Sequence, residues 1–323
     1  MKMKSLCFDG RNLCIKETEI PVPKEGEVLI RVCMAGICKT DLEIVKGYMD
    51  FKGILGHEFV GEVIEAENKN LIGKRAVGEI NCPCYRCAFC LQGMSNHCLN
   101  RTVLGIYNRN GVFAEYTTLP EKNLHIVPDD IPNEIAVFTE PVAACYRILE
   151  QVQFNPDDFV VVLGDGRMGQ IISQVINPYV RRLVCVGKHS TKLYLLNILG
   201  IDTCLFDYWK DKNIDVVIDA TGNPTAQSFA LDILRPQGTL IMKSTTEKLN
   251  TLNLSKLVVN EISIIGSRCG PFAPALKALA EKKVEVEYMI SHKFAFVDAI
   301  KAFEIAQHND CLKVLMDFQN TKG

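Results

Sequence analysis

The pattern of hydrophobic and polar positions changes once along the chain, near Pro156. Before this point, short alternating or β-branched segments are separated by Gly and Pro, a pattern that predicts strands. The clearest of these segments are Glu27 to Cys33, Glu58 to Glu65, Arg75 to Glu79 and Ala114 to Thr118. We therefore expect an irregular, mostly β region in the first part of the chain.

After Pro156, continuous apolar runs alternate with amphipathic segments. Such runs predict strands of a parallel sheet that is covered on both faces, so the fold class is α/β with a doubly wound parallel sheet. The predicted strands are 159–163, 183–186, 216–219, 239–242 and 262–265, and the predicted helices are 170–176, 190–199, 225–234, 273–281 and 298–307. A final apolar strand is expected around Val314. The segment Phe206 to Ile214 is too short for a helical crossover, so we expect a sheet that is trimmed there.

Length and composition narrow the class of protein. A chain of 323 residues with 48% hydrophobic content can form about two domains. Its formal charge of -2 and the lack of a basic stripe argue against nucleic acid or an anionic membrane as a partner. No apolar run could span a bilayer, and the basic N-terminus leads into no secretory apolar segment. Fourteen cysteines then indicate a reducing compartment, and we expect a cytoplasmic protein.

A glycine-rich loop follows the strand that ends at Leu163. Its sequence is Gly164-Asp165-Gly166-Arg167-Met168-Gly169, and a helical segment begins directly after it. Between a strand and a helix, this spacing indicates a dinucleotide site. Gly164 would form the turn, Gly166 would admit the pyrophosphate, and Gly169 would let helix and strand approach.

The next strand bears on the choice of dinucleotide. An NAD enzyme usually has an acidic residue about 20 residues after the fingerprint, to bind the ribose 2′-hydroxyl. No acid occurs from Gly166 through Ile201, and the strand instead ends in Gly187, Lys188, His189 and Ser190. These cationic and hydroxyl groups favour a 2′-phosphate, so we predict NADP rather than NAD. The alternative is a solvated basic turn.

Four cysteines, spaced Cys84-x2-Cys87-x2-Cys90-x7-Cys98, indicate one tetrahedral zinc ion. A site closed by four thiolates has no open coordination position, so this zinc should be structural. Cys82 lies close by and is a possible competing ligand.

A second set of metal-binding residue types is scattered over the first half of the chain. Cys38 precedes Thr40 and Asp41, Gly56 is followed by His57 and Glu58, and Glu140 is followed by Pro141. Three such ligands with an open fourth position would form a catalytic zinc site. Spacing alone would not pair them, because isolated Cys and His residues are more often structural.

Taken in chain order, these motifs resemble the zinc-dependent medium-chain alcohol dehydrogenase family over essentially the whole chain. The Glu-Pro pair at 140 and 141 resembles the branch of polyol, threonine and glucose dehydrogenases. The resemblance implies a GroES-like catalytic domain at 1–142 with a zinc lobe at about 82–98, a Rossmann domain at 143–269, and a return to the catalytic domain at 270–323.

The resemblance also implies a role for each matching position. Cys38 and His57 would bind the catalytic zinc with either Glu58 or Glu140, and Asp41 would orient His57. Thr40 would pass the substrate proton outward, with Glu43 standing where many relatives have a relay histidine. Further positions would line the nicotinamide half of the cofactor: Thr221, Ser244, Thr245, Ser267 and Arg268.

The expected protein is thus an oxidoreductase with two zinc ions per chain and NADP, acting on a small alcohol or polyol or the matching aldehyde or ketone. A homodimer or homotetramer is expected from the resemblance. Four alternatives remain at this point: an NAD-using polyol or threonine-type dehydrogenase, a zinc-free quinone or enoyl reductase, a zinc-ribbon binding module, and a nucleotide sensor without catalysis.

Overall fold

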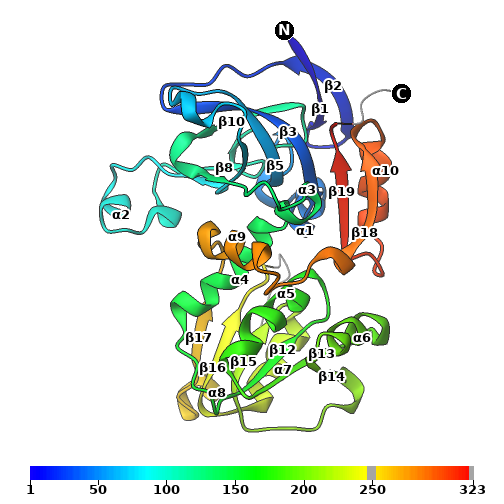
Figure 1. Cartoon of the computed structure of the whole chain (residues 1–323). Coiled ribbons are helices and arrows are strands. Elements are labelled where there is room, and N and C mark those ends of the chain that lie inside the picture. The colour runs from blue at the N-terminus through cyan, green and yellow to red at the C-terminus, as the bar shows by residue number, and fades with distance from the viewer. Residues whose placement is uncertain (246–251, 320–323) are drawn as a thin grey trace. The chain divides into compact units, whose positions relative to one another are not determined.

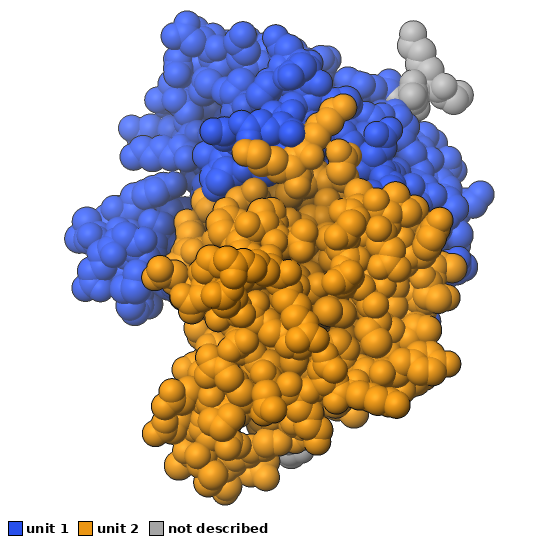
Figure 2. Space-filling view, turned by 60° about the horizontal axis from the view of Figure 1, so that its bottom comes forward, with its two compact units in different colours: residues 1–140, 272–281, 286–323 blue, residues 141–271, 282–285 orange. Residues whose placement is uncertain are grey.

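The structure is a computed structural model, and it describes residues 1–245 and 252–319. The chain forms two compact units (Figure 2). Unit 1 contains Met1–Glu140, Phe272–Glu281 and the described residues from Val286 onward, and unit 2 contains Pro141–Pro271 and Lys282–Glu285. The sequence places the domain changes at 142/143 and 269/270, and it gives no sign that Lys282–Glu285 belongs to unit 2.

Unit 1 is built on β-sheets, as its alternating pattern predicts. Its strands are β1 (Lys2–Phe8), β2 (Leu13–Glu19), β3 (Glu27–Ile37), β4 (Gly53–Ile54), β5 (Glu58–Glu65), β6 (Arg75–Gly78), β7 (Asn81–Cys82), β8 (Thr102–Leu104), β9 (Asn108–Arg109), β10 (Tyr116–Pro120), β11 (Leu124–Ile126), β18 (Ile290–Ala295) and β19 (Lys313–Asp317). The largest sheet has the order β11-β6-β5-β3-β19-β18, and β10 also pairs with β3. The C-terminal strand β19 therefore lies inside this sheet (Figure 1).

The helices of unit 1 are short. They are α1 (Lys39–Val45), α2 (Ala88–Leu91), α3 (Asn133–Ala136), α9 (Phe272–Ala280) and α10 (Ala299–Ala306), and α4 (Thr139–Gln151) continues into unit 2. Helix α10 contacts β18 and β19 and presents buried Ala302 and Phe303. The ring of Phe303 packs edge-on against Phe113, with the centroids 5.7 Å apart. The final segments of the chain therefore contribute to the core of unit 1.

Unit 2 is a parallel six-stranded sheet with the order β14-β13-β12-β15-β16-β17. Its strands are β12 (Phe159–Leu163), β13 (Arg182–Gly187), β14 (Asp202–Leu205), β15 (Ile214–Asp219), β16 (Leu234–Met242) and β17 (Ser263–Gly266), and its further helices are α5 (Arg167–Ile176), α6 (Ser190–Ile198), α7 (Pro224–Ile233) and α8 (Leu254–Val259). Every residue of β12 is buried, which explains its uninterrupted apolar sequence.

The expectation of a trimmed sheet is wrong. The connection after β14 does lack a helix, because only the 3-10 helix η6 (Phe206–Tyr208) forms there. The strand before it is present nevertheless, since β14 pairs in parallel with β13 from Val184↔Asp202 to Gly187↔Leu205. The sheet keeps six strands, and its strand order reverses between β12 and β15. Ligands of such sheets bind at the carboxyl ends of the strands near this reversal.

Among the described residues, no helix combines the length and apolar character needed to cross a membrane.

Candidate functional site

The four cysteines of the zinc motif lie together in unit 1, in the segment between β7 and β8 that carries α2. Their Sγ atoms are 3.5 Å apart for Cys87 and Cys90, 3.5 Å for Cys84 and Cys98, and 3.8 Å for Cys87 and Cys98. A tetrahedral zinc with Zn–S bonds of ~2.3 Å requires Sγ separations of about 3.8 Å. The four side chains therefore fit one zinc ion.

Backbone N–H groups surround these sulfur atoms. The amides of Cys84 and Asn100 each lie 3.3 Å from Sγ of the buried Cys98. Donation from the Arg86 backbone N–H is the largest influence that lowers the pKa of the Cys84 thiol, to about 6. The thiol of Cys90 is affected in the opposite direction, because burial and the neighbouring Cys87 and Cys98 thiols raise its pKa to about 12. The backbone N–H groups around Cys84 and Cys98 are the part of this environment that suits thiolate ligands of zinc.

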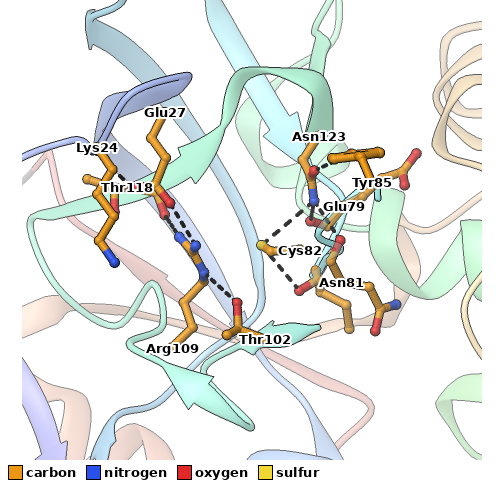
Figure 3. Close-up of polar contacts among 11 residues, drawn as sticks. Lys24, Glu27, Glu79, Asn81, Cys82, Tyr85, Thr102, Arg109, Thr118 and Asn123 are labelled. Carbon is orange, nitrogen blue, oxygen red and sulfur yellow. Dashed lines mark hydrogen bonds and ion pairs between the residues drawn. The ribbon is translucent and has the colours of Figure 1, made fainter. Parts of the chain in front are cut away.

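Cys82 does not belong to this cluster, which consists of the other four cysteines. Its thiol donates toward the Ile80 carbonyl at 3.9 Å and accepts from Asn123 Nδ2 at 3.8 Å (Figure 3). Burial raises the pKa of the Cys82 thiol to about 11, so it stays protonated near neutral pH. Asn123 also donates to the carbonyls of Glu79 and Asn81, which makes this network a structural support beside the lobe.

A second cluster of possible metal ligands is formed by Cys38, His57 and Glu58, whose donor atoms all lie within 4.8 Å of one another. Cys38 follows β3 directly, and His57 precedes Glu58 at the start of β5. Strands β3 and β5 are antiparallel neighbours, with Gly36 paired to Glu58. This pairing brings together residues that are far apart in the sequence.

Asp41 holds two members of this cluster in place. Its Oδ2 atom accepts the Cys38 backbone N–H at 2.8 Å, and its Oδ1 atom lies 3.2 Å from His57 Nδ1, close enough for an ion pair but without hydrogen-bond geometry. Burial alone would lower the pKa of His57, but the Asp41 carboxylate and Cys38 outweigh it and hold that pKa well above its usual value. The negative groups around the imidazole thus provide a setting for a cation, with Nδ1 oriented toward Asp41.

Lys313 is a residue of this site that sequence reasoning missed. Its ammonium group donates to Glu58 Oε2, and the two side chains are only 2% and 1% exposed. Lys313 begins β19, whose Val314 pairs with Ile37 of β3. At Gly36 a Cβ would lie 2.8 Å from Glu58 Oε2, so glycine leaves room for this ion pair. The sequence did contain a signal for this residue, because Lys313 is the first residue of an apolar strand that is buried throughout. A buried lysine needs a partner of opposite charge.

The other Glu58 oxygen supports a metal at this place. Glu58 Oε1 is buried and has no hydrogen-bond partner among the described residues. An unpaired buried carboxylate oxygen is costly, and a cation shared with Cys38 and His57 would satisfy it. One thiolate, one imidazole and one carboxylate are a donor set that zinc accepts in catalytic sites.

Three further residues, Thr40, Glu43 and Glu140, were predicted to take part in the reacting centre. Thr40 Oγ1 is 3.8 Å from Cys38 Sγ. Glu43 lies further along α1 and forms an exposed ion pair with Lys46 at 3.1 Å. Glu140 is in the first turn of α4 and is not a member of the three-residue cluster, so its part as a ligand stays a prediction.

In unit 2, the glycine-rich loop has the geometry of a nucleotide-binding turn. Gly164 has φ +112 and donates its N–H to the Val186 carbonyl. A Cβ at Gly169 would lie 1.7 Å from the Gly164 carbonyl oxygen, so only glycine permits this approach of α5 to β12. A Cβ at Gly166 would meet nothing within 4 Å, which leaves room before the N-terminus of α5, where Arg167 and Met168 begin the helix.

The predicted residues around the nicotinamide lie at the carboxyl ends of neighbouring strands. A Cβ at Gly222 would be 3.2 Å from Ser244 Cβ and from the Thr245 carbonyl oxygen, so these two loops touch. The hydroxyl of Thr221 donates to buried Asp219 at 2.6 Å. Lys243, a residue that sequence reasoning missed, donates to Ser267 Oγ at 3.2 Å and to the Arg268 carbonyl at 2.6 Å, and so ties the ends of β16 and β17 together.

Comparison with known proteins places this geometry in a family context. The chain matches the family models of an alcohol dehydrogenase GroES-like domain at residues 24–129 and of a zinc-binding dehydrogenase at residues 183–285. It is 30% identical to the starvation-sensing protein RspB of Escherichia coli K12, over 98% of this chain and 99% of that protein. It is 27% identical to a sorbitol dehydrogenase of Halalkalibacterium halodurans, over 94% of this chain and 95% of that protein.

Solved structures include a similar fold over the whole chain. The crystal structure of rspB from Escherichia coli CFT073, described as a short chain alcohol dehydrogenase complexed with NADH, has a TM-score of 0.91. It is 26% identical in sequence and covers 98% of this chain and 99% of its own.

Proposed function

This chain belongs to the zinc-dependent medium-chain alcohol dehydrogenase family, and we propose that it transfers hydride between NADP(H) and a small alcohol or polyol, or the matching aldehyde or ketone. As an alcohol dehydrogenase it depends on zinc and on a nicotinamide cofactor. NADP as that cofactor, the polyol-like substrate and two zinc ions per chain are the finer parts of the proposal.

The observation that carries the proposal is the cluster of half-buried Cys38 with buried His57 and Glu58, one of whose carboxylate oxygens is unsatisfied among the described residues. A zinc held there would act as a Lewis acid that favours loss of the proton from a bound alcohol. Asp41 orients the imidazole, and Lys313 binds one oxygen of Glu58, which leaves the other oxygen without a partner among the described residues. Glu140 is the alternative third ligand in this proposal.

Proton transfer in this site is assigned to the hydroxyl of Thr40. It lies beside Cys38 and would accept the alcohol proton and pass it outward, by way of Glu43 or water. Removal of the Thr40 hydroxyl should lower the turnover rate more than the affinity for the substrate, because the hydroxyl takes part in a proton transfer that occurs only during the reaction.

The preference for NADP rests on the turn after β13. Lys188 and His189 follow Gly187 there, and β13 itself carries no acidic residue. The rspB structure holds NADH, so the cofactor of that relative does not argue for NADP. The 2′-phosphate would contact the Lys188 and His189 side chains of this turn.

One panel of assays tests the proposal. Purified protein is given polyols, simple secondary alcohols and the matching carbonyls with NADP or NAD in parallel, and cofactor absorbance is followed. We expect polyol oxidation with NADP, lost in Cys38→Ser, and two zinc ions per chain by elemental analysis. Turnover that persists after complete zinc removal, or a zinc content of one, would contradict the two-zinc dehydrogenase.

A pairing of two or four copies is also proposed. Strand β17 is at the edge of the sheet and most of it is exposed. Nearby α8 exposes Leu254, Val258 and Val259 by 67% to 79%. An exposed strand edge beside apolar side chains favours pairing with a second copy. Light scattering should give a dimer or tetramer, and Val258→Glu with Val259→Glu should yield monomers.

The cytoplasm is proposed as the location. None of the fourteen cysteines forms a disulfide, and all of them lie within the described residues. Thiols in this number are usual in a reducing compartment. Fractionation of cells that carry a tagged chain would test this.

A further inference from the structure

Asp165, the residue between the first two glycines of the nucleotide loop, turns its side chain toward the carboxyl end of β13. Its Oδ2 atom accepts the backbone N–H of Lys188 at 2.7 Å and that of His189 at 2.6 Å. Its Oδ1 atom lies 3.0 Å from Nδ1 of the His189 ring. The residue is only 6% exposed. A buried carboxylate of the glycine loop therefore holds the turn that follows the next strand.

The carboxylate also occupies the place of a side chain at Gly187. A Cβ at Gly187 would lie 2.3 Å from Asp165 Oδ2, so no larger residue fits there. In dinucleotide-binding folds, the residue at this strand end lies near the 2′ position of the adenosine ribose. The absence of an acid on β13 thus does not mean that the strand end lacks a carboxylate.

Two roles are open to such a carboxylate. It could bind the ribose hydroxyls directly, as the strand-end acid of an NAD enzyme does. Alternatively, it could orient the groups that bind a 2′-phosphate. The hydrogen bonds favour the second role, because three donors already occupy most of the four acceptor positions of a carboxylate.

Two exposed side chains with nitrogen donors, those of Lys188 and His189, lie at this strand end. The His189 side chain is 46% exposed, and its contact with Asp165 uses Nδ1, so Nε2 is the nitrogen that can meet a ligand. The Lys188 ammonium group lies 5.7 Å from the centre of the Phe206 ring, beside the same strand ends. Because Nδ1 donates its proton to the Asp165 carboxylate, Nε2 can donate to a phosphate only when the imidazole carries both protons.

We propose that Asp165 is a specificity-determining positioning residue, which holds the turn from Gly187 to Ser190 so that His189 Nε2 and Lys188 bind the 2′-phosphate of NADP(H). This inference rests on the proposed use of NADP(H). It goes further because it assigns the discrimination between NADP and NAD to Asp165, which does not contact the phosphate. Asp165 lies in the glycine-rich loop, whereas Lys188 and His189 follow β13.

The test is direct binding of two fragments that differ only at the 2′ position. Adenosine 2′,5′-bisphosphate and 5′-AMP are titrated by calorimetry into the wild type, Asp165→Asn, His189→Ala and the double variant. Asp202→Asn is the matched control, because it makes the same change at an exposed position that begins β14. Thermal melts establish that each variant is folded.

For the wild type we expect tighter binding of the bisphosphate than of 5′-AMP. Asp165→Asn should weaken binding of the bisphosphate by about 10-fold or more, as expected for the loss of one charge-assisted hydrogen bond. The affinity for 5′-AMP should change by less than about 2-fold. Because Asp165 acts partly through His189 and partly through Lys188, the loss of binding free energy in the double variant should be smaller than the sum of the two single losses.

Three results would overturn the inference. Equal losses for both fragments would make Asp165 only a structural part of the loop. A gain in bisphosphate affinity in Asp165→Asn would make its carboxylate the acid that excludes a 2′-phosphate. Additive losses in the double variant would show that Asp165 does not act through His189. A wild type that prefers 5′-AMP would refute the NADP proposal itself, whereas failure of the alcohol assays would leave the binding results standing.

Discussion

The two candidate metal-binding clusters of unit 1 are built in opposite ways. The cysteine lobe takes Cys84, Cys87, Cys90 and Cys98 from one short segment. The second cluster takes Cys38, His57 and Glu58 from the ends of two strands, and Glu58 pairs with Lys313 of a third. The first offers four sulfur atoms and no open position. The second mixes donors and leaves a carboxylate oxygen unsatisfied. A local cluster can form on its own loop, but the distributed one exists only after the sheet has assembled.

Cys38→Ser should have the largest effect, and it should affect the second cluster without affecting the cysteine lobe. We expect activity to fall on the order of 10³-fold or more, because the Lewis acid contributes several kcal/mol to the transition state. Elemental analysis should show the loss of one zinc, with little change in the melting temperature. Cys14→Ser, at a cysteine outside both clusters, should retain both zinc ions; loss of zinc there too would mean that the clusters are not independent.

The next largest effect is expected for Lys313→Met, which leaves the Glu58 charge buried without its partner. The free energy of unfolding should fall by about 3–5 kcal/mol in urea titrations. Lys293→Met is the matched control, since Lys293 on neighbouring β18 pairs with Glu134 while 44% exposed, and it should change stability by less than ~1 kcal/mol. Similar losses in both variants would show that the buried pair does not support the distributed cluster.

A smaller, local effect is expected for Cys98→Ser. The variant should lose the other zinc and open the segment between β7 and β8, while the large sheet stays folded. Limited proteolysis of that segment should be about 10-fold faster, which corresponds to ~1.4 kcal/mol in the opening equilibrium. Global unfolding of unit 1 in this variant would contradict the independence of the lobe.

The smallest effect is expected for Cys82→Ala. This change removes a buried thiol and its contacts with Asn123 and Ile80, at a cost of about 1 kcal/mol in unfolding free energy. Both zinc ions should remain by elemental analysis. A zinc content of one would reveal Cys82 as a ligand of the lobe.

Local signals explain what the sequence could predict. The spacing of Cys84 to Cys98 and the loop from Gly164 to Gly169 are continuous in the chain, and the strands of unit 2 are apolar throughout because both of their faces are buried. The pairing of Cys38 with His57, in contrast, depends on the antiparallel register of β3 and β5. Only the family resemblance connected those two residues beforehand.

The two missed side chains, Lys313 and Asp165, share one physical cause, which is that their partners lie far away in sequence. Lys313 is 255 positions from Glu58, and Asp165 reaches a turn more than 20 residues later. A search for an acid on β13 could not find a carboxylate that enters from another loop. Strand β14 was missed because the connection after it lacks a helix, which says nothing about the strand itself.

The position of β19 has a consequence for how the protein is made. This strand lies between β3 and β18, yet it follows the whole of unit 2 in chain order. Domains generally fold as units while the ribosome delivers them from the N-terminus. Here the nucleotide-binding unit can finish folding first, whereas the sheet around Cys38 and His57 must wait for Lys313 to emerge. The nascent chain therefore completes the cluster of Cys38, His57 and Glu58 only after unit 2 has been synthesised.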